Sequence, residues 1–316
     1  MPKKIIIDTD PGIDDAMAIF FALKSPELDV LGLTTTFGNG HTSLTTLNAL
    51  RLLEIADRPD VPVAKGSDHA LIADFDDPGA IVHGDDGQGN LNLPMPTTEA
   101  IPESAAEFIV ESVQAHPDEV TLVAIGPLTN LALALRLDSQ IADKVAGVVL
   151  MGGNAFTQGN ISPAAEANIY HDPEAADVVF GAGWDVTMVG LDVTHQVYLS
   201  PEDILRYGHM KNPLAQHISQ ILPFYQAFYK QIYGFEGIYV HDSTAIAYLL
   251  APDAFETHRL PVRVETQGFS RGKTWVSNGT ESIIAPWENR PLVNVCVNVD
   301  AKRTLALEWA RMADEE

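Results

Sequence analysis

Short apolar runs alternate with helical patterns through the first half of the chain, and this alternation restricts the fold more than any other feature. Near-continuous apolar runs are typical of parallel strands that helices cover on both faces of a sheet. The strands expected from these runs are residues 5–8, 30–35, 61–64, 121–125, 145–151 and 187–191. The helices expected between them are residues 14–23, 44–55, 105–115, 128–137 and 173–180.

The second half adds further patterns without a linker, a low-complexity segment or an internal repeat. We therefore predict an α/β fold of one domain, residues 1–316, with a Rossmann-like, mixed and mostly parallel central sheet flanked by helices. Such sheets bind ligands at the carboxyl ends of their strands, so we expect the active site there. An irregular segment, residues 68–98, is long enough to be functional. The helices expected in this half are residues 213–235, 243–250 and 301–312, and the strands are 262–265, 274–276 and 293–297.

The chain is strongly acidic, with 19 basic and 43 acidic side chains and a formal charge of −24. This charge repels nucleic acid and anionic membranes, whereas a neutral small molecule is not repelled. Solubility alone would also explain an acidic surface. The one cysteine, Cys296, lies in an apolar run and is expected to be a buried strand residue. No signal peptide precedes the first strand and no apolar stretch reaches the length of a membrane span, so we expect a cytoplasmic protein.

Four carboxylates, Asp8, Asp10, Asp14 and Asp15, lie within eight residues where the first strand turns into the first helix. Asp14 and Asp15 alone would be explained by the preference of carboxylates for a helix N-terminus. That explanation does not cover Asp8 and Asp10, which precede a Pro-Gly turn. A hard divalent cation would neutralise this charge, and its ligands would be carboxylate oxygens. The sequence therefore indicates a metal site at the end of the first strand.

His241 and Asp242 precede the helical pattern of residues 243–250 and have two interpretations. Asp242 is either a plain helix N-cap or a distant carboxylate that completes the metal site. In the second interpretation His241 is a proton donor beside the metal site.

The loop that follows residues 145–151 carries Asn160, Glu166 and Asn168. Because Glu166 and Asn168 are two residues apart, an extended chain would point both in the same direction. Amides and a carboxylate suit a polyhydroxylated ligand, whose hydroxyls both donate and accept hydrogen bonds. An ordinary polar loop is the alternative.

Tyr225, Tyr229 and Tyr233 recur at four-residue steps on one face of an expected helix. Such a stripe is either part of the core or a surface on which a flat ring stacks. His83, in a segment rich in Gly and Asp, would ordinarily be solvated. Motifs for dinucleotide binding, a phosphate loop and a nucleophile elbow are absent from the sequence, and no Cys/His cluster indicates zinc.

The residues from Asp8 to Ala16, Asp-Thr-Asp-Pro-Gly-Ile-Asp-Asp-Ala, resemble the hallmark segment of the nucleoside hydrolases. Two positions depart from the family pattern: Ala167 stands where many members carry a bulky aromatic residue, and residues 85–89 are more acidic than expected. Further segments that resemble the family, in its order and at similar spacing, are residues 35–39, 83–84, 125–130, 149–153, 166–170 and 241–242.

The resemblance implies calcium-dependent hydrolysis of the N-glycosidic bond of purine and/or pyrimidine ribonucleosides, which yields ribose and a free base for nucleoside salvage or catabolism. It implies a homo-oligomer, dimeric or tetrameric, whose partner is a small-molecule ribonucleoside rather than nucleic acid or a membrane. The implied Ca²⁺ ligands are Asp10, Asp15, Asp242 and the backbone carbonyl of Ile125.

The same resemblance assigns roles to the other residues. Asp10 would be the general base that takes a proton from the attacking water. His241 would protonate the leaving base, since histidine ordinarily titrates near neutral pH, and His83 would also act near the base. The ribose hydroxyls would be bound by Asp14, Asn39, Asn160, Glu166, Asn168 and Asp242, and the base would be met by Tyr229 and Tyr233.

Two other functions fit part of the sequence. Phosphatases of the haloacid dehalogenase type also carry Asp-x-Asp after the first strand, and there Asp8 would be the nucleophile. Gly12 replaces their usual Thr or Val, and basic residues for a phosphate are scarce around these motifs. A calcium-dependent ribose or nucleoside binding protein would keep the carboxylates without using Asp10 or His241 as catalysts.

Overall fold

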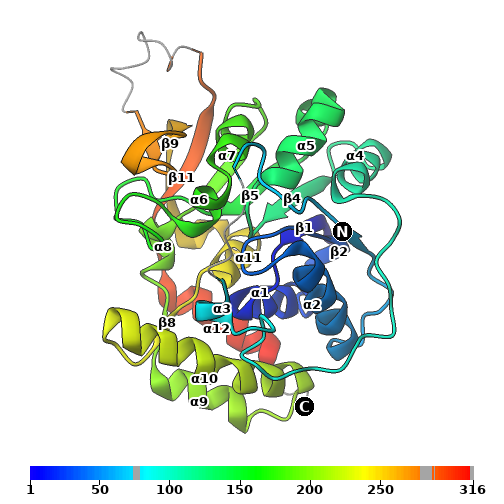
Figure 1. Ribbon diagram of the computed structural model, residues 1–316, viewed down its shortest axis with the longest axis vertical. Helices are drawn as coiled ribbons and strands as arrows, with labels where there is room; N and C mark the ends of the chain where they lie inside the picture. The colour runs from blue at the N-terminus through cyan, green and yellow to red at the C-terminus, as the bar shows by residue number, and fades with distance from the viewer. Residues whose placement is uncertain (74–78, 278–286, 288, 314–316) are drawn as a thin grey trace.

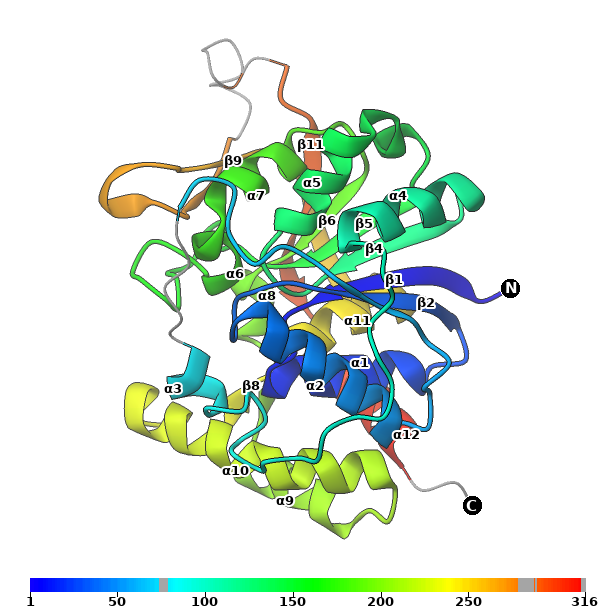
Figure 2. The ribbon, with the colours of Figure 1, turned by 45° about the vertical axis from the view of Figure 1, so that its right-hand side comes forward.

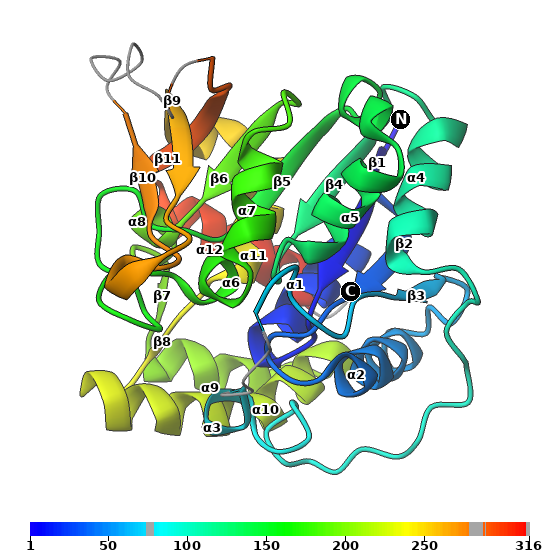
Figure 3. The same cartoon turned by 45° about the horizontal axis from the view of Figure 1, so that its top comes forward.

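The computed structural model describes residues 1–73, 79–277, 287 and 289–313. In this part of the chain nine strands form one sheet in the order β10-β9-β11-β6-β5-β4-β1-β2-β3, with β10 and β3 at its two edges (Figures 1 and 3). From β11 to β3 all neighbours are parallel, whereas β9 is antiparallel to both β11 and β10. The predicted mixed, mostly parallel sheet is therefore confirmed. The strands are β1 (Lys3–Thr9), β2 (Leu28–Thr35), β3 (Val63–Lys65), β4 (Val120–Ala124), β5 (Gly147–Met151), β6 (Val186–Val189), β9 (Phe255–Val264), β10 (Thr274–Val276) and β11 (Leu292–Val299), and a separate ribbon pairs β7 (Tyr198–Leu199) with β8 (Ile238–Tyr239).

Helices cover both faces of the sheet (Figures 1 and 2). Side chains alternate along β1, so that Ile5 and Ile7 join one hydrophobic core and Ile6 joins the other. The first core is covered by α1 (Ile13–Leu23), α2 (Thr42–Ile55), α10 (Pro213–Tyr233), α11 (Asp242–Leu250) and α12 (Ala301–Met312). The second core is covered by α4 (Ala105–Ala115), α5 (Thr129–Leu137) and α7 (Pro173–Phe180).

The prediction missed the shorter elements. Residues 187–191 are not strand to their end, because Gly190 is the N-cap of a short helix that begins at Leu191. Cys296 is fully buried on β11, as predicted. In the described residues no helix has the length and apolar character needed to cross a membrane. The missed helices are α3 (Gly79–His83), α6 (Ala167–His171), α8 (Leu191–Thr194), α9 (Pro201–His209) and the 3₁₀ turns η1 (Ser139–Asp143), η2 (Pro252–Ala254) and η3 (Gly268–Ser270).

A buried acid joins the C-terminal helix to the rest of the molecule. The Tyr207 hydroxyl of α9 donates to Glu308 Oε1 of α12 over 2.8 Å, and Glu308 is 2% exposed. Burial raises the pKa of Glu308 from 4.5 to about 7. The folded protein therefore binds this proton more tightly than the unfolded chain, and the free energy of unfolding falls as the pH rises through that interval.

We expect Glu308→Gln to remove this pH dependence, because the amide stays neutral and keeps an oxygen for Tyr207. The variant should become more stable than the unmodified chain as the pH rises to about 8, by up to about 3 kcal/mol, and should lose that advantage near about pH 4. Urea unfolding of both proteins across this range measures the difference, with the exposed Glu202→Gln on α9 as control. A difference that does not grow with pH would contradict the prediction.

Candidate active site

The carboxylates of the opening segment converge at the carboxyl end of β1, in the middle of the sheet between β4 and β2. β1 ends at Thr9 and α1 begins at Ile13, so the intervening turn holds its acidic side chains in the interior. Carboxylate oxygens of Asp14, Asp15 and Asp242 lie within 4.8 Å of one another. Asp242 reaches this point from far along the chain because α11 packs against α1.

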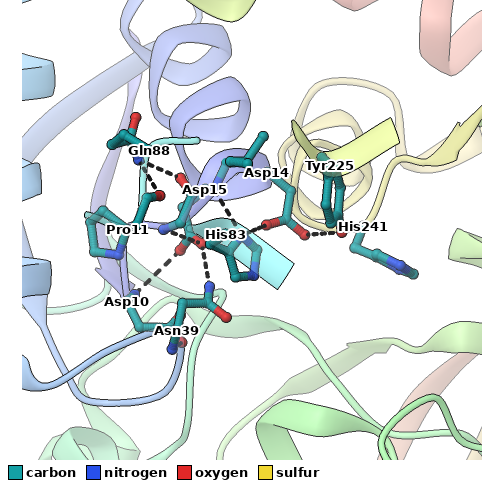
Figure 4. A network of polar contacts seen from close by, with 12 residues as sticks. Asp10, Pro11, Asp14, Asp15, Asn39, His83, Gln88, Tyr225 and His241 are labelled. Atoms are coloured by element: carbon teal, nitrogen blue, oxygen red, sulfur yellow. Dashed lines mark hydrogen bonds and ion pairs between the residues drawn. The ribbon is translucent and has the colours of Figure 1, made fainter. Parts of the chain in front are cut away.

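Asp15 shapes the turn (Figure 4). Its Oδ1 accepts hydrogen bonds from Thr9 Oγ1 at 2.5 Å and from the backbone N–H of Asp10 at 3.2 Å. Its Oδ2 accepts from the backbone N–H of Gly12 at 3.0 Å and from Asn39 Nδ2 at 2.9 Å. The side chain of Asp15 thus replaces water around four donors and fixes the positions of the neighbouring carboxylates.

Asp10 is wedged between two glycines. A Cβ atom at Gly38 would lie 2.0 Å from Asp10 Oδ2, and one at Gly126 would lie 2.6 Å from Oδ1. Gly38 also has a φ of +146°, which favours glycine. The backbone N–H of Asn39 donates to Asp10 Oδ2 over 2.7 Å. Both glycines belong to segments that resemble the family, and here they admit a fully buried carboxylate.

The pKa values of four carboxyl groups at this site, those of Asp10, Asp14, Asp15 and Asp242, are raised above their ordinary values. Burial, the largest cause, raises the pKa of Asp14 to about 6, and burial followed by repulsion from Asp14 raises that of Asp15 to about 6. Burial first, then the neighbouring carboxylates, also raises the pKa of Asp10 and of Asp242. Among the described residues, no lysine or arginine forms an ion pair with them, and only His83 approaches, at 4.0 Å from Asp14 Oδ1.

These residues fit a divalent cation. In the described part of the chain, Asp10 Oδ1 and Asp14 Oδ1 are buried without a hydrogen-bond partner. Buried polar atoms ordinarily have partners, and an unpaired carboxylate oxygen is costly. A cation beside several carboxylates would favour their ionised forms and use these oxygens.

A cavity of about 750 Å³, counted with its open mouth, lies over the carboxylates. Asp10 and Asp15 are not on its wall but are buried beneath it, each 0% exposed. The structure therefore brings almost all of the predicted site residues to one place. The predicted residues on the wall are Asp14, Asn39, His83, Ile125, Asn160, Glu166, Asn168, Tyr229, Tyr233, His241 and Asp242.

Glu166 and Asn168 face the cavity, but not through an extended chain, so that expectation is wrong. Glu166 is the N-cap of α6, and its carboxylate accepts from the backbone N–H of Gly153, Asn168 and Ile169 at 2.9, 2.9 and 3.1 Å. The two donors from α6, Asn168 and Ile169, make Glu166 a helix N-cap and not a strand residue. Burial raises the pKa of Glu166 to about 7. Asn168 Nδ2 donates to the carbonyl of Ile125 over 3.0 Å.

His83 is buried in α3, not solvated as its surroundings suggested. Its Nδ1 accepts from the backbone N–H of Ile13 over 3.1 Å, at the first turn of α1. In the neutral ring the proton is therefore on Nε2. The His83 ring stacks on Tyr225, with 5.6 Å between the centroids.

Asp242 is not the N-cap of α11, because the helix begins at Asp242 and His241 occupies the cap position. His241 Nδ1 lies 2.8 Å from Thr194 Oγ1, and its Nε2 lies 2.9 Å from the Tyr229 hydroxyl. Burial, followed by the charges of His195 and His83, lowers the pKa of His241 to about 3. The direction of this shift runs against the expectation that His241 titrates near neutral pH.

The tyrosine stripe of α10 belongs both to the core and to the cavity. Tyr225 and Tyr229 are buried and Tyr233 is 40% exposed. The Tyr225 hydroxyl donates to Asp14 Oδ2 over 3.2 Å and lies 3.4 Å from the Tyr229 hydroxyl. Tyr225 was not assigned to the site, although its four-residue spacing from Tyr229 signalled it. No sequence signal marks Thr194.

The fold and the site define a class of α/β enzymes, and comparison with known proteins identifies it. The profile of the family described as "Inosine-uridine preferring nucleoside hydrolase" matches residues 5–306. A probable uridine nucleosidase 2 of Arabidopsis thaliana is 46% identical, covering 99% of this chain and 98% of that protein. An inosine-uridine preferring nucleoside hydrolase of Leishmania major is 43% identical over 85% of each chain.

Solved structures agree. A plant nucleoside hydrolase superposes with a TM-score of 0.97 at 41% identity and covers 100% of both chains. A purine-preferring ribonucleoside hydrolase from Gardnerella vaginalis gives 0.91 at 34% identity and covers 98% of both. The chain therefore belongs to the nucleoside hydrolase family. It is an N-ribosyl hydrolase, and the phosphatase alternative is not retained.

Proposed function

We propose that this enzyme hydrolyses ribonucleosides with the help of a resident Ca²⁺ ion, and that uridine is among its substrates. The observation that supports the ion is the group of buried carboxylates, two of whose oxygens have no partner in the described residues. Relatives named as uridine nucleosidases support uridine as a substrate. We further propose that the enzyme is a homo-oligomer with one domain over residues 1–316. Its role would be nucleoside salvage or catabolism in the cytoplasm.

Asp10, Asp15, Asp242 and the carbonyl of Ile125 would hold the ion. Hard oxygen donors of this kind suit Ca²⁺, which takes carboxylates and backbone carbonyls together. Bound there, calcium would orient a water molecule and make it more acidic. Asp14 lies in the same group of oxygens and also faces the cavity, so it would meet both the ion and the sugar.

Asp10 would act as the general base through its unpartnered Oδ1. Ribosyl transfer to water passes through an oxocarbenium-like sugar, which carries positive charge. Carboxylates around the sugar stabilise that charge more than they stabilise the neutral nucleoside, and this difference lowers the barrier. The ribose hydroxyls would be bound by Asp14, Asn39, Asn160, Glu166, Asn168 and Asp242.

The leaving base would lie against the aromatic wall. Tyr229 and Tyr233 stack with 5.3 Å between their centroids. His241 would take up a proton from solvent and pass it to the leaving base through the Tyr229 hydroxyl, which returns the imidazole to its neutral form. His83, with its proton on Nε2, would be a second donor.

One experiment tests the activity and the ion together. Reducing-sugar release from uridine, cytidine, inosine, adenosine and guanosine is measured with the untreated, the chelated and the calcium-restored protein, with 2′-deoxyuridine as control. We expect activity on uridine, its loss on chelation and its return with calcium, and weak activity on the deoxynucleoside, which lacks one bound hydroxyl. An active, metal-free protein would overturn the calcium proposal. Uridine binding without hydrolysis in any state would overturn the catalytic one.

A further inference from the structure

Residues 154–166 make up most of the loop between β5 and α6; this segment carries Asn160 and ends at Glu166, so it forms one wall of the cavity. Before Glu166 this loop contains no charged side chain. In Figures 1 and 3 it extends beside α8 and the β9–β10 hairpin. Two ionisable side chains from these neighbours, Asp192 and Lys273, hold its first residues.

Lys273 supplies a cation to the loop. Its side chain is buried, and Nζ donates to the carbonyls of Asn154, Thr157 and Ala155 at 2.5, 3.3 and 3.5 Å. An ammonium has three donors and no acceptor, so three carbonyls match it completely. Burial lowers the pKa of Lys273, whereas the charge of Asp192 raises it.

Asp192 binds the donors of the same peptide units. Its Oδ2 accepts from the backbone N–H of Ala155 and its Oδ1 from that of Phe156, both at 2.7 Å. Thr274 Oγ1, next to Lys273, accepts from the backbone N–H of Asn154 at 2.7 Å. Asp192, Lys273 and Thr274, here called the peptide clamp, therefore fix both the N–H and the C=O groups at the start of the loop.

The far end of the loop is tied to this start. Asn154 Nδ2 donates to the carbonyls of Thr157 and Ala164 at 3.0 and 2.9 Å. Asn160 Oδ1 accepts from the backbone N–H of Ala167 at 3.0 Å, which aligns Asn160 with α6. A displacement of Asn154 would therefore change the position of the loop that carries Asn160.

We propose that Lys273 and Asp192 are positioning residues for the nucleoside, which act by holding the loop of residues 154–166 in the conformation that presents Asn160 to the sugar. This inference rests on the proposed function for the role of Asn160. Ordering a free loop costs conformational entropy. Without the peptide clamp the loop would have to become ordered when the substrate binds, so the free energy of substrate binding would be less favourable. If only about one molecule in ten held the competent loop, the apparent affinity would fall about tenfold while turnover at saturation stayed unchanged.

Lys273→Met tests the proposal, because it keeps much of the side-chain volume and removes the charge and the donors. We expect KM for uridine to rise about tenfold with kcat changed by less than about twofold. Amide hydrogen exchange, followed by mass spectrometry, should accelerate in residues 154–166. Lys273→Gln keeps an N–H donor for the carbonyls and should recover part of both losses. If Lys273→Met folds poorly, Lys273→Gln replaces it in both measurements.

Arg271→Gln is the matched control. Arg271 lies two residues away on the same hairpin, but it pairs with Glu174 of α7 at 2.6 Å instead of contacting the loop. Its loss should lower stability without changing KM or exchange in residues 154–166. A merely structural role for Lys273 would reduce the active fraction, and therefore the apparent kcat, at constant KM.

Unchanged exchange in the loop, or faster exchange with an unchanged KM, would overturn the proposal. Failure of the proposed function is a separate result. If the unmodified protein does not hydrolyse uridine, calorimetric titration with uridine still tests the role of the peptide clamp. The affinity of Lys273→Met for uridine should then be about tenfold lower than that of the unmodified protein.

Discussion

Asp10→Asn lowers kcat for uridine by about three orders of magnitude, as we expect for the loss of a general base together with part of the charge that stabilises the sugar cation. Asparagine has nearly the shape of aspartate, so it fits between Gly38 and Gly126 and still accepts the N–H of Asn39. The fold should therefore survive while the proton acceptor is lost. The measurement is kcat at saturating nucleoside and calcium, with bound metal determined on the same samples.

Asp8→Asn is the control for this prediction. Asp8 is also buried, near the end of β1 and two residues before Asp10, and its Oδ1 accepts from Thr34 Oγ1 and Asn130 Nδ2 at 2.6 and 2.8 Å. Burial raises the pKa of Asp8 to about 7, so the neutral amide resembles a form that the carboxyl already adopts. We expect turnover within about tenfold of the unmodified enzyme. Near-normal turnover of Asp10→Asn would refute its role as the base.

Local signals made the sheet and the metal site predictable. Strands buried on both faces give near-continuous apolar runs, so β1, β2 and β4 were located to within two residues. Asp10, Asp14 and Asp15 were found because the turn from β1 to α1 places them together within a few residues of sequence. The carboxyl end of a central strand then fixed where the cavity lies.

Tertiary packing determined what the sequence could not show. Asp242 was assigned to the metal site through the family resemblance and not through a local signal, because only the packing of α11 against α1 brings it to Asp14 and Asp15. The role of Glu166 as the N-cap of α6 was not predicted. The pKa of His241 depends on a burial that no local pattern encodes. The peptide clamp was missed for the same reason, since Asp192 and Lys273 lie far apart in the sequence and belong to no motif.

His241→Ala should lower kcat for inosine by about 10²–10³, and should have little effect on p-nitrophenyl riboside. A purine needs a proton to leave, whereas p-nitrophenolate departs as a stable anion. The structure places His241 between Thr194 and the Tyr229 hydroxyl, at 2.8 and 2.9 Å, within a buried set of groups that continues through Tyr225 to Asp14.

Tyr229→Phe separates the two possible routes of that proton. The ring stays in the cavity wall and only the hydroxyl is lost, so stacking against the base is preserved. If the proton passes from His241 through Tyr229, the phenylalanine variant should lose activity on inosine and keep it on p-nitrophenyl riboside, and its effect should not add to that of His241→Ala. Equal losses on both substrates would mean that these two residues position the nucleoside and do not protonate it. Because burial lowers the pKa of His241 to about 3, its imidazolium fraction falls about tenfold for each pH unit above that value, so kcat for inosine should fall from about pH 6 to about pH 8 while kcat for p-nitrophenyl riboside should not.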